Sequence, residues 1–228
     1  MKVSPPRVRA VLIGGRAPLG PVLSGIDKHP VSGPHAVALL GLHGDEQGDM
    51  QAHGGVDKAM HVYPWAHYAR WRERYPAQTL FEQPGAFGEN LSIDGLDESE
   101  VCIGDEWRIG SVRLVITQGR QPCYRLNLRF GARDMAAQVQ QTLRTGWYLR
   151  VLEPGRLAAG DEPELLRRPH PDWSVAALLT LIRDRVVDAE ILAPVLDLPL
   201  TPSWRKLFTQ RLRSAAVEDW TRRLDGAG

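Results

Sequence analysis

The stretch GDEWRIGSVRLVIT, residues 104–117, decides the fold expected of this chain. Apolar residues alternate with polar ones on both sides of the pair Gly110-Ser111, which suits a tight turn. We therefore predict a hairpin of two strands, residues 101–110 and 112–117. Further runs rich in β-branched residues, bounded by glycine or proline, occur at residues 7–14, 35–41, 90–95 and 146–152. This pattern predicts a mainly β fold, a barrel or a sandwich.

Helical patterns interrupt these strands and then replace them. Residues 64–75 and 132–145 are predicted to be short helices inserted among the strands. After residue 168, Ser174 and Asp188 are suited to cap helices, and residues 202–224 form one long helical pattern. We therefore predict two domains, a β domain over residues 1–167 and a small α-helical bundle over residues 168–228.

The composition is that of an ordinary globular protein, with 43% hydrophobic and 24% charged residues in a chain of 228. No run approaches the roughly 20 apolar residues of a membrane span, and the first residues lack the apolar run of a secretion signal. We expect a cytoplasmic location and no membrane partner. The net charge of +1 argues against a nucleic-acid partner. The two cysteines, Cys102 and Cys123, are not expected to form a disulfide in a reducing compartment.

Charge is distributed unevenly along the chain. Residues 82–107 carry eight acidic side chains and no basic ones, whereas residues 108–150 carry eight arginines against one acid. Neighbouring strands could pair these opposite charges. The basic segment could equally form an anion-binding site, and the sequence leaves both interpretations open.

Cys123 lies in this basic segment, within QGRQPCYRL, residues 118–126. A lone cysteine is most often a small packing residue, and Cys102 is predicted to be one. Around Cys123, however, Arg120 and Arg125 can stabilise the thiolate, which is the nucleophile and the ligand of soft metals. We therefore interpret Cys123 as a candidate for chemistry.

Glycine-rich loops could present backbone N–H groups to an anion, although each alone is more often a tight turn. They cover residues 41–49, 53–59, 86–91, 103–107 and 118–123. The signatures GxGxxG, GxxxxGK[ST] and GxSxG, which mark nucleotide sites and hydrolases, are absent. A metal cluster of His53, His61 and His67 with Asp45 and Asp49 is a weak alternative, because these residues lack a spacing such as HExxH.

Four motifs, in this order, resemble the molybdenum cofactor sulfurase C-terminal (MOSC) domain. They are HGGVDKAMHVYP (53–64), GAFGENLSIDGL (85–96), VCIGDEWRIG (101–110) and QGRQPCYRL (118–126). A fifth, GWYLRVLEPGRLAAGD (146–161) followed by helices, resembles the bacterial YiiM-like subgroup, which appends a three-helix domain. The resemblance covers almost the whole chain. The family pattern has proline where this chain has Gly119, which predicts a looser loop before the cysteine.

The resemblance implies a MOSC-type β-barrel that binds a molybdenum cofactor, Mo-molybdopterin, with Cys123 as the protein ligand to molybdenum. It also implies reduction of N-hydroxylated compounds, such as hydroxylamino-purines, to amines. A separate flavin or iron–sulfur reductase would supply the electrons, because this chain has neither cluster cysteines nor a nucleotide fingerprint.

The same resemblance, read with the chemistry of the motifs, suggests roles for individual residues. Besides Cys123, His61 and Asp57 are candidates for proton delivery in catalysis. Glu89 could bind the cofactor or could instead cap a turn. The expected cofactor-binding residues are His53, Gly54, Gly55, Lys58, Glu89, Asn90, Arg120 and Gln121, with Arg120 clamping the cofactor phosphate.

Two other functions stay open at this point. The pocket could hold the cofactor, or Cys123 could carry a persulfide, without turnover. Alternatively, the protein could act through its C-terminal helices by docking a partner. The same helices could also cover the barrel mouth or form a homodimer.

Overall fold

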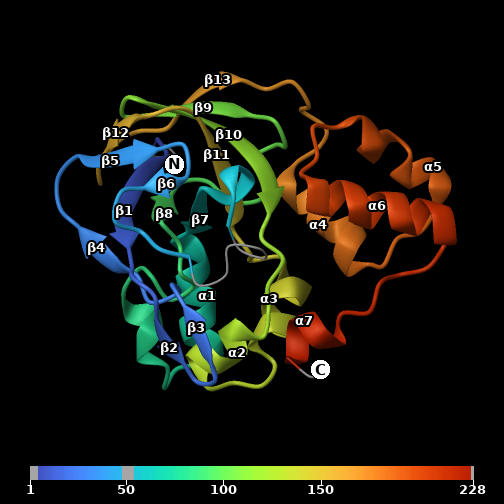
Figure 1. Cartoon of the computed structure of the whole chain (residues 1–228), viewed down its shortest axis with the longest axis horizontal. Helices are drawn as coiled ribbons and strands as arrows, with labels where there is room; N and C mark the ends of the chain where they lie inside the picture. The colour runs from blue at the N-terminus through green and yellow to red at the C-terminus, as the bar shows by residue number, and fades with distance from the viewer. Residues whose placement is uncertain (1–4, 48–53, 227–228) are drawn as a thin grey trace.

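One curled, eight-stranded sheet forms the centre of the protein (Figure 1). The structure is a computed structural model and describes residues 5–47 and 54–226. Hydrogen-bonded neighbours follow the order β13-β9-β10-β11-β7-β8-β1-β4, so the sheet forms a half-barrel and the predicted mainly β class is confirmed. Its strands are β1 (Arg7–Ile13), β4 (His29–Val31), β7 (Met60–Pro64), β8 (Leu91–Asp94), β9 (Glu106–Ile109), β10 (Val112–Gly119), β11 (Trp147–Glu153) and β13 (Glu164–Arg167).

The predicted hairpin is confirmed as β9 and β10. Ile109 pairs with Val112 across the turn, and both side chains are buried in the core. Gly110 has φ of 57°, and a Cβ added there would come within 2.4 Å of a backbone oxygen. The turn therefore requires glycine at this position. The first strand is shorter than predicted, because residues 101–105 leave the sheet and Cys102 forms only an isolated bridge.

Two smaller sheets flank the half-barrel. The predicted strand over residues 35–41 is two strands, because the chain reverses before Gly41, whose φ is 121°. One sheet pairs β2 (Ala17–Leu19) with β3 (Val22–Ser24), and the other has the order β12 (Gly155–Leu157), β5 (His35–Ala38) and β6 (Gly41–Leu42).

Helices inserted between the strands build an aromatic core beside the sheet. The two inserted helices predicted from the sequence are confirmed as α1 and α3. Trp71 of α1 and Phe81 are buried, and the stacked rings of Tyr63 and Phe87 lie 4.1 Å apart. These contacts fix the loop that contains Phe87, which borders the site described below. The inserted elements are η1 (Val56–Lys58), α1 (Ala66–Arg74), η2 (Thr79–Glu82), α2 (Arg125–Phe130) and α3 (Met135–Thr142).

Helices alone follow β13. They are α4 (Val175–Arg183), α5 (Ala189–Leu192), η3 (Pro194–Asp197), α6 (Pro202–Ser214) and α7 (Thr221–Asp225). Both predicted caps are confirmed: Ser174 Oγ accepts a hydrogen bond from the Ala177 N–H, and Asp188 caps α5 in the same way. The strands end at Arg167, whereas the domain boundary after residue 167 stays a prediction.

The single helix predicted over residues 202–224 is wrong. Ala215 adopts a left-handed conformation, with φ of 48°, and ends α6. The buried guanidinium of Arg211 then binds the Glu218 carboxylate, which folds the following segment back on α6. As a result, α7 lies apart from α4, α5 and α6 and contacts α3 (Figure 1).

Gly119 marks the contact between the sheet and the C-terminal helices. It is the last residue of β10 and lies against α4, where an added Cβ would come within 2.8 Å of the Leu179 side chain. Glycine therefore lets α4 approach β10, and the position is packed, contrary to the looser loop expected from the sequence. Within the described residues, no helix is long and apolar enough to cross a membrane.

Candidate functional site

A small cavity of about 80 Å³ opens where β3, the start of β7 and the loop after β10 converge. It is lined by charged and polar side chains, among them Lys28, Asp45, His61, Asn90, Arg120 and Cys123. We call it the inner cavity. Burying so many polar groups is costly unless they bind one another or a ligand, so their partners define what the cavity can hold.

Cys123 lies in the loop of residues 120–124, here called the cysteine loop, which connects β10 to α2. Its carbonyl accepts a hydrogen bond from the Leu126 N–H at 2.9 Å, as the chain turns into α2. The thiol is free of any disulfide and only 9% of the residue is exposed. Cys123 borders both the inner cavity and a second, larger one. The fold therefore presents a reduced sulfur to an enclosed space.

Arg120 is held rigidly at the start of the cysteine loop. Its backbone N–H donates to the Gly146 carbonyl at 3.0 Å, and its Nη1 donates to the Phe87 carbonyl at 2.7 Å. Both acceptors are neutral, so the positive charge of this buried side chain is not cancelled by a carboxylate. It stays directed at the cavity as part of the wall, where an anion would stabilise it.

A buried ion pair lies on another side of the inner cavity. Lys28 Nζ binds Asp45 Oδ1, and the other oxygen of Asp45 accepts from Asn90 Nδ2 at 2.8 Å. Burial lowers the pKa of Lys28, while the charge of Asp45 opposes that shift. Asn90 also accepts from the His61 N–H at 3.0 Å. The network joins four segments that are separate in sequence and fixes a lysine at the cavity.

His61, on β7, is a neutral ring in this site. Burial and then the charge of Arg120 hold its pKa well below the ordinary value. Its Nε2 lies 3.1 Å from the Thr145 carbonyl, a partner that requires an N–H at this nitrogen. A neutral imidazole anchored to a carbonyl can orient a ligand but is a poor acid at neutral pH.

The second cavity, about 590 Å³, lies between the cysteine loop and the C-terminal helices. We call it the outer cavity. It shares five residues with the inner one: Lys58, Arg120, Cys123, Arg125 and Tyr148. The C-terminal part of the chain contributes Ser203, Asp219, Arg222 and Arg223. Cys123 thus stands where two adjoining spaces meet, both rich in basic side chains.

Comparison with known proteins identifies the family. The model of the MOSC domain matches residues 49–164. YiiM of Escherichia coli is 39% identical over 205 residues, which cover 89% of this chain and 91% of that protein. The chain belongs to the MOSC domain family.

Two further relatives extend the comparison. The crystal structure of YiiM from Escherichia coli superposes with a TM-score of 0.81 at 33% identity, covering 96% of this chain and 98% of that one. A protein of Gibberella moniliformis named "Reductase" is 38% identical over 210 residues, 92% of this chain. The chain spans only 37% of the length of that fungal protein. The C-terminal helices therefore belong to the shared architecture of this MOSC protein and YiiM.

Several residues predicted for the MOSC site lie at the two cavities. Cys123, Arg120, Lys58, Asn90 and His61 border the inner cavity, and Gln121 borders the outer one. Gly54 and Gly55 border neither cavity. His53 and Asp49 lie outside the described residues. The cofactor contacts proposed for these groups stay predictions.

Glu89 and Asp57, both predicted to act in the site, bind other parts of the protein in the structure. Glu89 is fully buried and accepts hydrogen bonds from Tyr68 Oη and from the Gly85 and Phe87 N–H groups, so it caps a turn instead of facing the inner cavity. Asp57 forms an ion pair with Arg150 and borders neither cavity. For Glu89 these contacts agree with the turn cap, one of the two roles that the sequence left open. The cofactor-binding role of Glu89 and the proton-delivery role of Asp57 stay predictions.

The arginines of residues 108–150 are divided between the two arrangements that the sequence left open, pairing with acids on neighbouring strands and forming a basic site. Arg113, on β10, pairs with Glu106 of β9 at 3.6 Å, as expected for neighbouring strands. Arg120 and Arg125 instead border the cavities. The weak metal-cluster alternative gains no support, because the described residues contain no group of three or more His, Cys, Asp or Glu side chains suited to a metal.

Sequence reasoning missed Lys28, Tyr148, Arg222 and Arg223. No motif marks Lys28, since only the return of the chain after β3 brings it to Asp45. Tyr148 lay within a predicted strand, and the alternation of side chains along β11 could have set it apart from its buried neighbours. The two C-terminal arginines were assigned to a long helix that does not exist.

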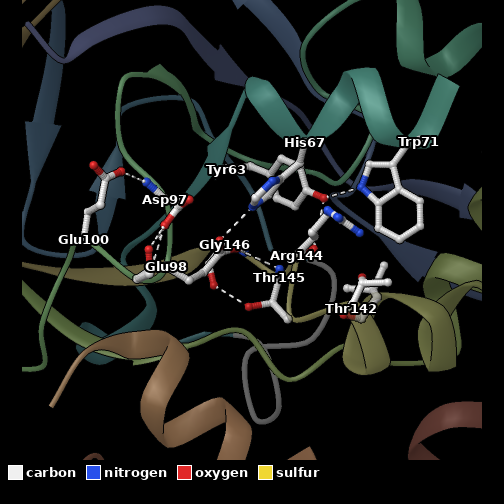
Figure 2. A network of polar contacts seen from close by, with 12 residues as sticks. Tyr63, His67, Trp71, Asp97, Glu98, Glu100, Thr142, Arg144, Thr145 and Gly146 are labelled. Atoms are coloured by element: carbon white, nitrogen blue, oxygen red, sulfur yellow. Dashed lines mark hydrogen bonds and ion pairs between the residues drawn. The ribbon is translucent and has the colours of Figure 1, made fainter. Parts of the chain in front are cut away.

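A buried carboxylate, that of Glu98, binds a backbone turn that contacts two residues of the site; Figure 2 shows this carboxylate and the turn. Glu98 Oε1 accepts from the Thr145 and Gly146 N–H groups at 2.9 and 2.6 Å, and Oε2 lies 2.7 Å from His67 Nε2. The turn held in this way provides the Thr145 carbonyl for His61 and the Gly146 carbonyl for Arg120. Glu98 therefore positions both site residues without bordering either cavity.

The donors around Cys123 fit the cofactor expected of a MOSC domain. A thiolate is a ligand for soft metals, and arginine and lysine bind phosphate groups. The structure brings one free thiol together with Arg120, Arg125 and Lys58 around adjoining cavities. This combination suits a group with both a metal and an anionic part.

Proposed function

We propose that this protein is a molybdenum-cofactor-dependent reductase of N-hydroxylated compounds, with hydroxylamino-purines as the substrate class. The observation that carries the proposal is the position of the Cys123 thiol, which forms no disulfide, at the junction of two cavities lined in part by basic residues. Membership of the MOSC family and similarity to a protein named "Reductase" support it. A separate flavin or iron–sulfur reductase would donate the electrons.

When bound, the cofactor would supply the two-electron chemistry by which R–NHOH, two electrons and two protons become R–NH₂ and water. Cys123 would hold the metal through its thiolate. Arg120 would bind an anionic group of the cofactor, because its charge is fixed at the wall and bonded only to carbonyl oxygens. Lys58 lies 5.9 Å from the Tyr148 ring and adds a second positive charge.

Protonated groups at the cavities would orient the N–OH group. Burial raises the pKa of Tyr148, so its phenol stays protonated and can donate a hydrogen bond. His61 is neutral, and its Nε2 is engaged with Thr145. We therefore assign His61 to orientation rather than to the proton delivery expected from the sequence.

The test compares wild type, Cys123→Ala and Cys102→Ala, all produced in a host that makes the cofactor. Cys102 is a matched control, because it is buried, free and borders neither cavity. Wild type and Cys102→Ala should contain molybdenum and reduce a hydroxylamino-purine with an electron donor, and Cys123→Ala should do neither. Equal molybdenum content or equal turnover in the Cys123 variant would contradict the proposal.

Mass spectrometry of the same purified proteins tests the carrier function. A free thiol facing a cavity is also what a persulfide carrier needs. Mass spectrometry of the purified protein that finds a persulfide on Cys123, without bound molybdenum, would favour the carrier over the reductase.

A further inference from the structure

The last helix of the chain is attached directly to the cysteine loop. The Tyr124 N–H donates to the Arg223 carbonyl at 2.7 Å, and Arg223 Nη1 donates to the Pro122 carbonyl at 2.5 Å. Asn127 Nδ2, on α2, donates to the Leu224 carbonyl at 2.7 Å. These bonds hold α7 beside residues 122–127, although about a hundred residues separate the two segments in sequence. Helix α7 is therefore part of the wall around Cys123.

This attachment carries two arginines to the outer cavity. Arg223 Nη2 donates to Gln140 Oε1 at 2.6 Å, so within the described part of the chain its guanidinium binds a side-chain amide and a carbonyl but no carboxylate. Arg222 is exposed, borders the outer cavity and forms no hydrogen bond or ion pair with any other residue that the structure describes. Asp219, an acid that borders the same cavity, accepts hydrogen bonds from the Thr221 N–H and Oγ1.

Charge is therefore concentrated in the outer cavity. Among the residues that the structure describes, those bordering the outer cavity include five basic side chains, Lys58, Arg120, Arg125, Arg222 and Arg223, and one acid, Asp219. A neutral purine base can accept hydrogen bonds but carries no negative charge to balance these cations. A phosphate monoester carries about two negative charges at neutral pH and three acceptor oxygens, which match the planar donors of arginine.

We propose that α7 supplies Arg222 to a phosphate-ester subsite in the outer cavity. The inference deepens the proposed function and rests on it for the identity of the reaction. The phosphate could belong to the cofactor or to the substrate, which would then be an N-hydroxylated nucleotide. In both cases the C-terminal helix takes part in ligand recognition, and Arg223 positions it by binding the cysteine loop.

The test uses the full chain with Arg222→Gln and, as a matched control, Arg213→Gln. Arg213 is also exposed on a C-terminal helix but does not border the outer cavity. Binding of adenosine monophosphate, which cannot be reduced, is measured by calorimetry at low and high salt. Loss of one charged donor should weaken binding about tenfold in Arg222→Gln and should leave Arg213→Gln unchanged.

Two further measurements identify the source of the phosphate. If Arg222→Gln purifies with less molybdenum and pterin than the control, the subsite serves the cofactor. If cofactor content is normal but the preference for a hydroxylamino-purine monophosphate over the free base is lost, the subsite serves the substrate. If Arg222→Gln does not differ from Arg213→Gln in adenosine monophosphate binding, in cofactor content or in substrate preference, the inference is wrong. Arg222-dependent phosphate binding in a wild type that reduces neither substrate would overturn the proposed function alone.

Discussion

Replacement of Glu98 tests whether this buried carboxylate holds the turn that positions His61 and Arg120. Only 4% of Glu98 is exposed, and its Oε1 accepts two backbone N–H groups. Glu98→Ala would leave the N–H groups of Thr145 and Gly146 buried without that acceptor. A hydrogen bond to a charged group contributes about 1.5–3 kcal/mol, so we expect the free energy of unfolding to fall by about 3–5 kcal/mol. This is a large part of the roughly 5–15 kcal/mol that stabilises a typical domain.

Urea unfolding followed by circular dichroism measures this loss. With a slope of about 2–3 kcal/mol per molar urea, the midpoint should fall by about 1.5 M. Glu98→Gln keeps an oxygen that can accept both N–H groups, and we expect it to lose only about 1–2 kcal/mol. Glu100→Ala is the matched control, because Glu100 accepts the Asp97 N–H at an exposed position of the same loop. Its midpoint should hardly change.

Cofactor retention distinguishes a local loss of site geometry from a general loss of stability. Displacement of the turn should move the carbonyls that hold His61 and Arg120, so Glu98→Ala should retain less cofactor even where it is fully folded, and Glu98→Gln should restore retention. A Glu98→Ala protein with the midpoint and cofactor content of Glu100→Ala would refute the reasoning.

Three other outcomes are expected. Because the pKa of His61 is well below 6.5 in the folded protein, the unfolded state binds the extra proton as pH falls below about 6.5. The free energy of unfolding should thus decrease on acidification, and less steeply in His61→Gln, as urea titrations at about pH 7.5 and pH 5.5 would show. Gly119→Ala should cost about 1 kcal/mol by crowding Leu179, and a double-mutant cycle with Leu179→Ala should show that the combined loss is smaller than the sum. Arg211→Ala should lower stability by about 2 kcal/mol or more in thermal unfolding, since its carboxylate and carbonyl partners are left unpaired, whereas Arg213→Ala should have no effect.

Local patterns were sufficient for the regular parts of the fold. The alternation in residues 104–117 gave the β9–β10 hairpin, and Ser174 and Asp188 began helices where their capping chemistry predicted. The pattern failed where the chain conformation depends on tertiary contacts. The helix over residues 202–224 breaks at Ala215 because Arg211 finds a carboxylate in the folded-back segment, and no local propensity records that pairing.

Only the site residues that lie within the sequence motifs could be predicted. Cys123 and Arg120 could be named because they share one loop. Lys28 and Arg222 could not, since only the folded chain brings them to the cavities. Glu89 lies in a glycine-rich motif for which the sequence left both ligand binding and a turn cap open. In the fold its carboxylate accepts the N–H groups of the glycine turn, a contact that the motif alone could not single out.

The attachment of α7 to the cysteine loop has a consequence for how the protein matures. Arg223 is translated one hundred residues after Cys123, which takes about 5–20 s at ribosomal rates. Throughout that interval the nascent cysteine loop lacks its α7 partner, and the wall of the outer cavity has not yet been made. A cofactor held by both would therefore be enclosed only after translation has passed α7, and a chain that stalls earlier would leave the Cys123 thiol more open to oxidants.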